Sequence, residues 1–250
     1  MTERLSLAPW PYPRWVAHRG AGKLAPENTL AAFRLGAAHG YRAFECDVKL
    51  SADGVPFLLH DATLERTSNG SGNAGLQPWA DLSQLDAGGW HSRAYAGEPL
   101  PTLAGIAAFI IANGFQLNIE IKPTPGQEAQ TGKAVAEHAA RLWAGQAVPP
   151  LLSSFRPDAL AAARDAAPAL PRALLLDSLP PGWQDQAAAL ACSAIVTHHP
   201  LMDAGLVAQL RARQWRALVY TVNEPADAAR LLALGIDGLI TDAVDRFSPA

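Results

Sequence analysis

Short strand-like segments alternate with Ala- and Leu-rich helical segments along most of the chain, and this alternation constrains the fold more than any other feature. We expect strands at Trp15–Ala17, Ala43–Val48, Asn118–Ile121, Leu151–Ser153, Ala173–Leu176, Ala194–Thr197, Ala217–Thr221 and Gly238–Thr241. We expect amphipathic helices at Thr29–Ala38, Leu103–Asn113, Glu128–Trp143, Pro157–Ala166, Asp203–Arg213 and Ala226–Leu234. Such alternation is typical of a parallel α/β sheet, and eight strands in 250 residues favour a closed (β/α)8 TIM barrel. An open, doubly wound sheet is the alternative.

One stretch interrupts the alternation. Residues 61–101 are rich in Gly, Ser, Asn and Asp and include Trp79 and Trp90, but they contain no amphipathic helix long enough to cover a barrel strand. We therefore expect a small insertion after the second strand, placed over the strand ends. No linker is evident, so residues 1–250 are predicted to form a single barrel domain.

Composition limits where the protein acts and what it binds. The net charge is −3 and the isoelectric point is near 6.1, so broad binding to nucleic acid or to an anionic membrane is not expected. No run approaches the roughly 20 apolar residues of a membrane helix, and residues 1–13 lack the apolar stretch of a signal peptide. With only Cys46 and Cys192, the chain is predicted to be cytoplasmic with reduced thiols.

Three acids fall on the same face of two expected strands. Glu45 and Asp47 stand two residues apart, as do Glu120 and Lys122, and side chains alternate across a strand. Three converging carboxylates repel one another unless a cation lies between them, and oxygen ligands favour a hard divalent ion such as Mg²⁺ or Ca²⁺. We therefore predict that Glu45, Asp47 and Glu120 hold one metal ion. Buried salt bridges to Arg42 or Lys122 are the alternative.

Two histidines end strand-like runs: His18 follows Trp15–Ala17, and His60 follows the apolar residues 55–59. An unperturbed imidazole titrates near a pKa of about 6.5, so such a pair can take one proton and donate another. We predict that His18 and His60 are a catalytic acid–base pair. Metal ligation by a histidine, which would favour Zn²⁺ or Mn²⁺, is the secondary interpretation.

The charges of this set indicate what the site attracts. The three carboxylates outweigh the two cations Arg19 and Lys122, so the pocket without metal would repel an anion. One divalent ion reverses the sign of the net charge, and the pocket then attracts a phosphodiester monoanion. The expected chemistry is metal-assisted cleavage of a phosphodiester.

Weaker candidates lie at strand ends and in the insertion. Phe155 and Tyr220 are expected to contact substrate, and Asn223 follows the same strand end as Tyr220. Less specific signals come from Trp79, Trp90, His91, His198 and His199. For these last residues, a place in the core or on the surface is the simpler interpretation.

The motifs resemble those of the glycerophosphodiester phosphodiesterase family, with bacterial cytoplasmic members as the nearest likeness. The motifs that carry the resemblance are His18-Arg19-Gly20, Pro26-Glu27-Asn28-Thr29, Glu45-Cys46-Asp47-Val48, Asp53-Gly54, His60-Asp61, Glu65-Arg66-Thr67, Pro101-Thr102-Leu103, Asn118-Ile119-Glu120-Ile121-Lys122, Ser153-Ser154-Phe155, Thr221-Val222-Asn223 and Thr241-Asp242. They follow one another along nearly the whole chain. Tyr220 departs from the pattern, since many members have Trp there, so we expect the fine shape of the alcohol or glycerol pocket to differ.

The resemblance implies a (β/α)8 barrel that hydrolyses deacylated phospholipids, such as glycerophosphocholine or glycerophosphoethanolamine, to sn-glycerol 3-phosphate and an alcohol. It implies that Glu45, Asp47 and Glu120 hold the metal, that His18 and His60 are acid and base, and that Arg19 and Lys122 bind phosphate. Two alternatives stand beside this function: an activity like phospholipase D or sphingomyelinase D on the same barrel, and a non-catalytic barrel that binds glycerophosphodiesters.

Overall fold

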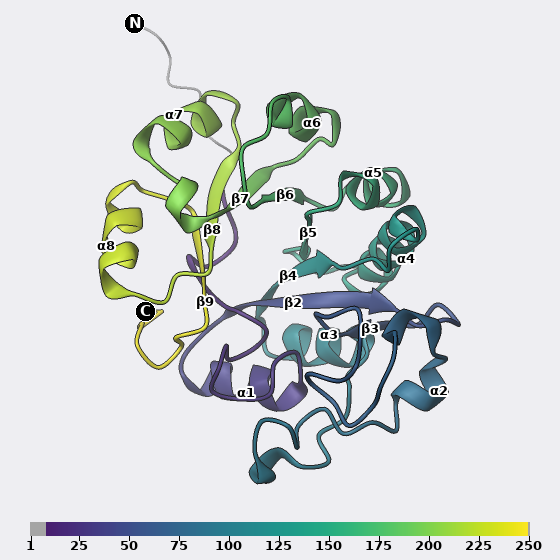
Figure 1. Cartoon of the computed structure of the whole chain (residues 1–250). Helices are drawn as coiled ribbons and strands as arrows, with labels where there is room; N and C mark the ends of the chain where they lie inside the picture. Colours follow the sequence, from purple (N-terminus) through teal and green to yellow (C-terminus); the bar gives the residue numbers. More distant parts are fainter. Residues whose placement is uncertain (1–8, 250) are drawn as a thin grey trace, which may run out of the picture.

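The structure, a computed structural model, describes residues 9–249. Eight parallel strands form a barrel that closes because β1 pairs with both β2 and β9 (Figure 1). The barrel strands are β1 (Trp15–Ala17), β2 (Ala43–Leu50), β4 (Gln116–Ile121), β5 (Leu151–Ser154), β6 (Arg172–Leu176), β7 (Ala194–His198), β8 (Arg216–Tyr220) and β9 (Gly238–Thr241). The predicted closed barrel is therefore confirmed, and the open sheet is excluded.

Helices surround the barrel and connect successive strands (Figure 1). They are α1 (Leu30–Ala38), α3 (Leu103–Ala112), α4 (Glu128–Leu142), α5 (Pro157–Ala166), α6 (Trp183–Ala189), α7 (Ala204–Ala212) and α8 (Pro225–Ala233). Thr29 caps α1, since its hydroxyl accepts from the Ala32 amide. The sequence analysis missed α6, which has only 7 residues and begins directly after Pro180, Pro181 and a left-handed Gly182.

The connection from β2 to α3 carries the insertion. Its first element, β3 (Pro56–Leu58), pairs antiparallel with the carboxyl-terminal part of β2. It is followed by two 3₁₀ turns (Ala74–Leu76 and Arg93–Tyr95) and, between them, the short helix α2 (Trp79–Leu82). The insertion has a small core of its own around Phe57, Leu64 and Leu82. The insertion after the second strand is thus confirmed, whereas the single domain of residues 1–250 stays a prediction.

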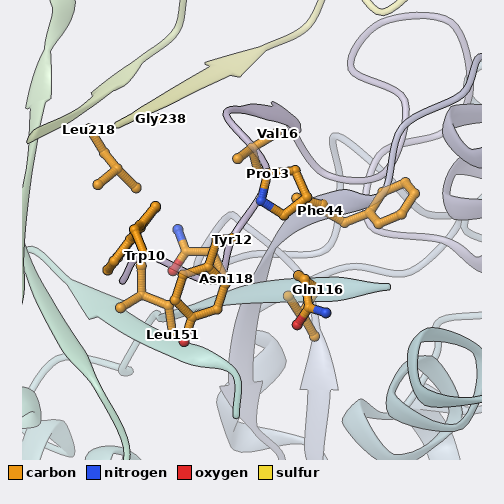
Figure 2. A pocket seen from close by; sticks show the side chains of 12 residues that line it. Trp10, Tyr12, Pro13, Val16, Phe44, Gln116, Asn118, Leu151, Leu218 and Gly238 are labelled. Atoms are coloured by element: carbon orange, nitrogen blue, oxygen red, sulfur yellow. The ribbon is translucent and has the colours of Figure 1, made fainter. Parts of the chain in front are cut away.

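The barrel interior is apolar at one end and polar at the other. Inward-facing side chains such as Val16, Leu151 and Leu218 pack together near the amino ends of the strands. Figure 2 shows Trp10 and Tyr12, which precede β1, lying among these residues around a pocket of only about 20 Å³. The Tyr12 hydroxyl donates to the Pro149 carbonyl at 2.9 Å. Because the N-terminal segment fills this end, a ligand site is left at the carboxyl ends of the strands.

The structure bears on two expectations from composition. None of the helices within residues 9–249 combines the length and the apolar character needed to cross a membrane. Cys46 and Cys192 are both free and buried. The first eight residues of the segment expected to lack a signal peptide lie outside the described range, and the cytoplasmic location stays a prediction.

Candidate active site

Three carboxylates converge at the carboxyl ends of β2 and β4. These strands pair in parallel register, with Glu45 opposite Asn118 and Asp47 opposite Glu120, so the acids share the inward face. One oxygen from each of Glu45, Asp47 and Glu120 lies within 4.8 Å of the other two, and all three residues are buried. The structure therefore brings the three predicted metal ligands together.

The electrostatics of this cluster call for a cation. Burial raises the pKa of Glu45 well above its usual range, and the neighbouring Asp47 and Glu120 raise it further. Burial, followed by Asp47, raises the pKa of Glu120 to about 7. Burial also acts to raise the pKa of Asp47, but Arg19 and Lys122 outweigh it and the pKa lies below its usual range.

Some oxygens of the cluster lack donors. Within residues 9–249, the buried atoms Glu45 Oε1 and Asp47 Oδ1 accept no hydrogen bond. A buried carboxylate oxygen that accepts no hydrogen bond is costly, and a divalent ion would compensate for it. The three carboxylates, all hard oxygen donors, thus form a site that can hold a divalent cation.

Two cations flank the acids. Arg19 Nε lies 3.0 Å from Asp47 Oδ2, and its backbone amide donates to Glu45 Oε2 at 3.1 Å. Lys122 Nζ lies 2.7 Å from Glu120 Oε1 and 3.5 Å from Asp47 Oδ1. Arg19 and Lys122 therefore lie beside the acids at the carboxyl ends of the strands, where both can bind an anion held over the cluster.

Hydrogen bonds to β2 hold the loop that carries Arg19 in an unusual backbone conformation. Arg19 and Asn28 both adopt left-handed backbone conformations, with φ of 51° and 60°. The Asn28 amide group donates to Asp47 Oδ2 at 2.8 Å, and its oxygen accepts from the Asp47 backbone amide at 3.1 Å. This conformation costs free energy for residues other than glycine, and the two hydrogen bonds to β2 hold it in place.

His18 has an acidic partner from the other end of the chain. Its Nδ1 lies 2.6 Å from Asp242 Oδ1, and its Nε2 lies 3.8 Å from Glu45 Oε2. Asn223 donates to Asp242 Oδ2 at 3.1 Å and accepts from the Asp242 amide at 2.9 Å. Asp242 therefore fixes the Nδ1 side of the ring, while Nε2 faces the carboxylate cluster. The sequence analysis gave Asp242 no role.

His60 reaches the site because β3 folds back along β2. The Leu59 amide donates to the Asp47 carbonyl at 3.1 Å, which brings the next residue over the acids. His60 Nδ1 lies 2.7 Å from Asp61 Oδ1. Burial lowers the pKa of His60, and Lys122 and Arg19 act in the same direction against Asp47.

Lys49 belongs to the same face of β2 as Glu45 and Asp47, and the sequence analysis missed it. The two-residue period that selected the acids also selects position 49. Its Nζ donates to the Lys122 carbonyl at 3.3 Å. Burial, together with the charge of Lys122, lowers the pKa of Lys49 to about 8.

A cavity of about 230 Å³ opens over the cluster. Its lining residues are His18, Arg19, Glu45, His60, Asn118, Glu120, Lys122, Phe155, Leu175, Tyr220, Thr221 and Ile240. Phe155 and Tyr220 meet edge to face at 5.7 Å between ring centroids, and Lys122 Nζ lies 5.5 Å from the Phe155 centroid. The cavity thus has a charged side, formed by β2, β4 and the residues that follow β1, β3 and β4, and an aromatic side at the carboxyl ends of β5 and β8.

The other weaker candidates lie outside that lining. Trp79 packs on Phe57 inside the insertion, at 5.9 Å between ring centroids, and Trp90 is 40% exposed. His91 contacts the Lys23 carbonyl at 3.1 Å. His198 packs beside Tyr220 at 6.0 Å between ring centroids, and His199 lies 3.7 Å from Asp227. Asn223 acts through Asp242, as described above.

A substitution at Gly22 tests how the loop between β1 and α1 is coupled to Asp242. Its φ is +58°, and a Cβ there would lie 2.1 Å from the Asp242 carbonyl oxygen. We expect Gly22→Ala to lower the free energy of unfolding by about 3 kcal/mol and to reduce kcat, because Asp242 must move away from His18. Thermal unfolding and steady-state kinetics measure the two effects. The control is Gly54→Ala, where φ is +83° and, apart from the chain neighbours, no atom of residues 9–249 lies within 4 Å of the added Cβ, so only about 1 kcal/mol should be lost. Equal effects of the two substitutions would contradict the coupling.

Known proteins are similar to this chain along nearly its whole length. The sequence profile of the Glycerophosphoryl diester phosphodiesterase family matches residues 18–246. The glycerophosphodiester phosphodiesterase of Caldanaerobacter subterraneus subsp. tengcongensis is 33% identical over 234 residues, which cover 91% of this chain and 93% of that protein.

Two solved structures are also similar to this chain over nearly its whole length. A phosphodiesterase of Oleispira antarctica in complex with the product sn-glycerol-3-phosphate has a TM-score of 0.87 and 34% identity, covering 94% of this chain and 95% of that one. The glycerophosphodiester phosphodiesterase of Agrobacterium tumefaciens has a TM-score of 0.79 and 26% identity, covering 95% of this chain and 100% of that one. The likeness therefore includes the insertion as well as the barrel.

Proposed function

The chain belongs to the glycerophosphoryl diester phosphodiesterase family and is an enzyme that acts on glycerophosphodiesters, and we propose that it hydrolyses deacylated phospholipids to sn-glycerol 3-phosphate and an alcohol in a metal-dependent reaction. The family resemblance seen in the sequence is confirmed by the profile match. The observation that carries the proposal is the cavity lined by two histidines, two cations and the carboxylates Glu45 and Glu120, which cluster with the buried Asp47. The product bound to the Oleispira antarctica relative supports the choice of product.

Glu45, Asp47 and Glu120 would hold the metal ion, and their oxygen donors fit Mg²⁺ or Ca²⁺ better than a softer metal. When bound, such an ion supplies Lewis-acid polarisation of the phosphoryl oxygens. Arg19 and Lys122 donate to the non-bridging oxygens of the phosphodiester from the flanks of the cluster. Their positive charges offset the negative charge that builds on phosphorus in the transition state.

The two histidines move the protons. One imidazole takes the proton from the nucleophile as its oxygen bonds to phosphorus, and the other protonates the alkoxide as its bond to phosphorus breaks. Asp242 on His18 and Asp61 on His60 hold the Nδ1 side of each ring and leave Nε2 for the substrate. The nucleophile is water, or the 2-hydroxyl of the glycerol moiety, which would give a transient cyclic phosphate.

The aromatic side of the cavity would receive the part of the substrate that carries no phosphate charge. Phe155 and Tyr220 form this side, and Tyr220 is fixed because its hydroxyl donates to the Leu176 carbonyl at 3.3 Å. Burial, followed by the nearby Asp177, raises the pKa of Tyr220 to about 12, so this hydroxyl stays neutral at physiological pH. We propose that both side chains contact substrate through their rings.

A coupled assay for glycerol 3-phosphate on a panel of head groups tests the proposal. We expect chelation to lower turnover at least about 100-fold, and Mg²⁺ or Ca²⁺ to restore it, because the cluster repels the phosphodiester without a cation. Mn²⁺ and Zn²⁺ are the comparison ions. Intact phospholipid supplied in place of its deacylated form measures any phospholipase D activity. Turnover that resists thorough chelation would contradict metal dependence, and release of no glycerol 3-phosphate from any head group would contradict the function.

A further inference from the structure

Arg66, from the insertion, bridges two carboxylates that belong to different parts of the active site. Its Nε lies 2.5 Å from Asp61 Oδ2, and its Nη2 lies 3.1 Å from Asp61 Oδ1. The same guanidinium donates through Nη1 to Glu27 Oε2 at 2.9 Å and through Nη2 to Glu27 Oε1 at 2.8 Å. Each carboxylate is therefore bound in the bidentate manner that only an arginine fork provides.

One branch of this bridge leads to His60. Asp61 Oδ1 accepts from both His60 Nδ1 and Arg66, so the orientation of the Asp61 carboxylate decides the orientation of the imidazole. The hydrogen bond from Arg66, with a smaller contribution from His60, lowers the pKa of Asp61 to about 2. Asp61 is thus a fixed, ionised acceptor for the ring.

The other branch leads to Arg19. Glu27 Oε1 accepts from Arg66 and also from Arg19 Nη1, at 2.9 Å. Arg19 Nε in turn lies 3.0 Å from Asp47 Oδ2. Glu27 therefore holds one end of the Arg19 guanidinium while Asp47 holds the other, and Arg66 determines where Glu27 stands.

Two further contacts attach the insertion to the same loop and helix. His91 contacts the Lys23 carbonyl at 3.1 Å, and the Ala31 amide at the start of α1 donates to Glu98 Oε1 at 2.9 Å. These contacts lie outside the cavity lining, whereas the Arg66 bridge ends on two of its residues. The insertion thus meets the β1–α1 loop and the start of α1 at several points, and of the three contacts named here only that of Arg66 continues to the cavity.

We propose that Arg66 is a positioning residue that couples the insertion to catalysis by orienting His60 through Asp61 and Arg19 through Glu27. The inference rests on the proposed function, because it assigns consequences to the proton transfer by His60 and the phosphate binding by Arg19. We therefore expect Arg66, whose side chain is 45% exposed, to affect kcat through Asp61 and His60 and KM through Glu27 and Arg19.

Single substitutions separate the branches. We expect Asp61→Asn to lower kcat mainly, because the imidazole loses its ionised acceptor, and Glu27→Gln to raise KM mainly, because Arg19 loses a partner. Arg66→Ala should do both, each by about 10- to 100-fold, which is the usual effect of removing a residue that orients a catalytic group. Adding Arg66→Ala to the Glu27→Gln/Asp61→Asn double variant should change little more, since both targets are already lost.

Two comparisons distinguish orientation from charge and from stability. Arg66→Lys keeps the positive charge but loses the fork, so it should recover only part of the activity. Arg93→Ala, on an exposed arginine of the same insertion, is the matched control and should resemble the wild type. Rates are expressed per active protein, with thermal unfolding measured for every variant.

The outcomes decide the proposal. Wild-type kcat and KM in Arg66→Ala, or full recovery in Arg66→Lys, would overturn it. So would a drop in thermal stability with unchanged kinetics, because that result makes Arg66 structural only. Failure of the proposed function gives a different result: the wild type would release no glycerol 3-phosphate, or His60→Ala would remain fully active.

Discussion

Glu45→Gln is expected to lower metal-dependent kcat by about 10³-fold, which corresponds to about 4 kcal/mol of lost transition-state stabilisation. The physical reason is that Glu45 Oε1 is buried and accepts no hydrogen bond within residues 9–249, so it is available to a cation. The chelated protein should respond in the opposite way. Burial already raises the pKa of Glu45 well above its usual range, so a neutral glutamine should leave its free energy of unfolding unchanged or higher.

Two companion variants sharpen this result. Asp47→Asn should also lose activity, but it should destabilise the chelated protein, because Arg19 and Lys122 each lose an ion-pair partner. Glu137→Gln, at a half-buried position of α4 outside the cavity lining, is the matched control for the change in charge. Calorimetric metal titration, thermal unfolding with and without chelator, and kcat are the measurements. A Glu45→Gln protein that binds metal and turns over like the wild type would remove Glu45 from the metal site.

His60→Ala is expected to lower kcat by about 10³-fold while the fold and metal binding persist. The His60 side chain is 32% exposed and comes from the insertion, so its loss leaves the barrel core intact. His18→Ala should have an effect of similar size for the same reason, since it removes the other proton carrier. Circular dichroism, metal titration and kcat on a glycerophosphodiester check these expectations.

The same two variants identify the acid. A glycerophosphodiester with a p-nitrophenyl leaving group needs no protonation of the departing oxygen, so the variant that lacks the acid should regain activity with it. The variant that lacks the base should remain slow with both substrates. His39→Ala, at the exposed end of α1, serves as the control. Equal recovery of His18→Ala and His60→Ala would contradict a division into one acid and one base.

The elements that follow a local period in the sequence could be predicted. Strands and most helices were predicted within one or two residues because their apolar periods and flanking residues are regular, as at Pro157–Ala166. Helix α6 was missed because 7 residues give too short a period to recognise. The three acids were predicted together because the two-residue period of a strand places Glu45 and Asp47 on one face, and Glu120 on the equivalent face of its neighbour.

The residues that orient the site could not be predicted in the same way. Asp242 lies 224 positions from His18, and Glu27 lies 39 positions from Arg66, so no local pattern joins the members of either pair. Both pairs form between loops, which have no period. Lys49 is different, because extending the pattern of Glu45 and Asp47 by two residues would have found it.

The pairing of β1 with β9 has a consequence for how the enzyme matures. The acids lie on β2 and β4, which are neighbours made early in synthesis, whereas the His18–Asp242 pair requires the last strand, β9, to pair with the first, β1. During synthesis the three residues proposed as metal ligands are therefore all present well before Asp242, the residue that contacts His18. With His18 acting as proposed, catalysis depends on the pairing of β1 with β9, so turnover would serve as a reporter of barrel closure.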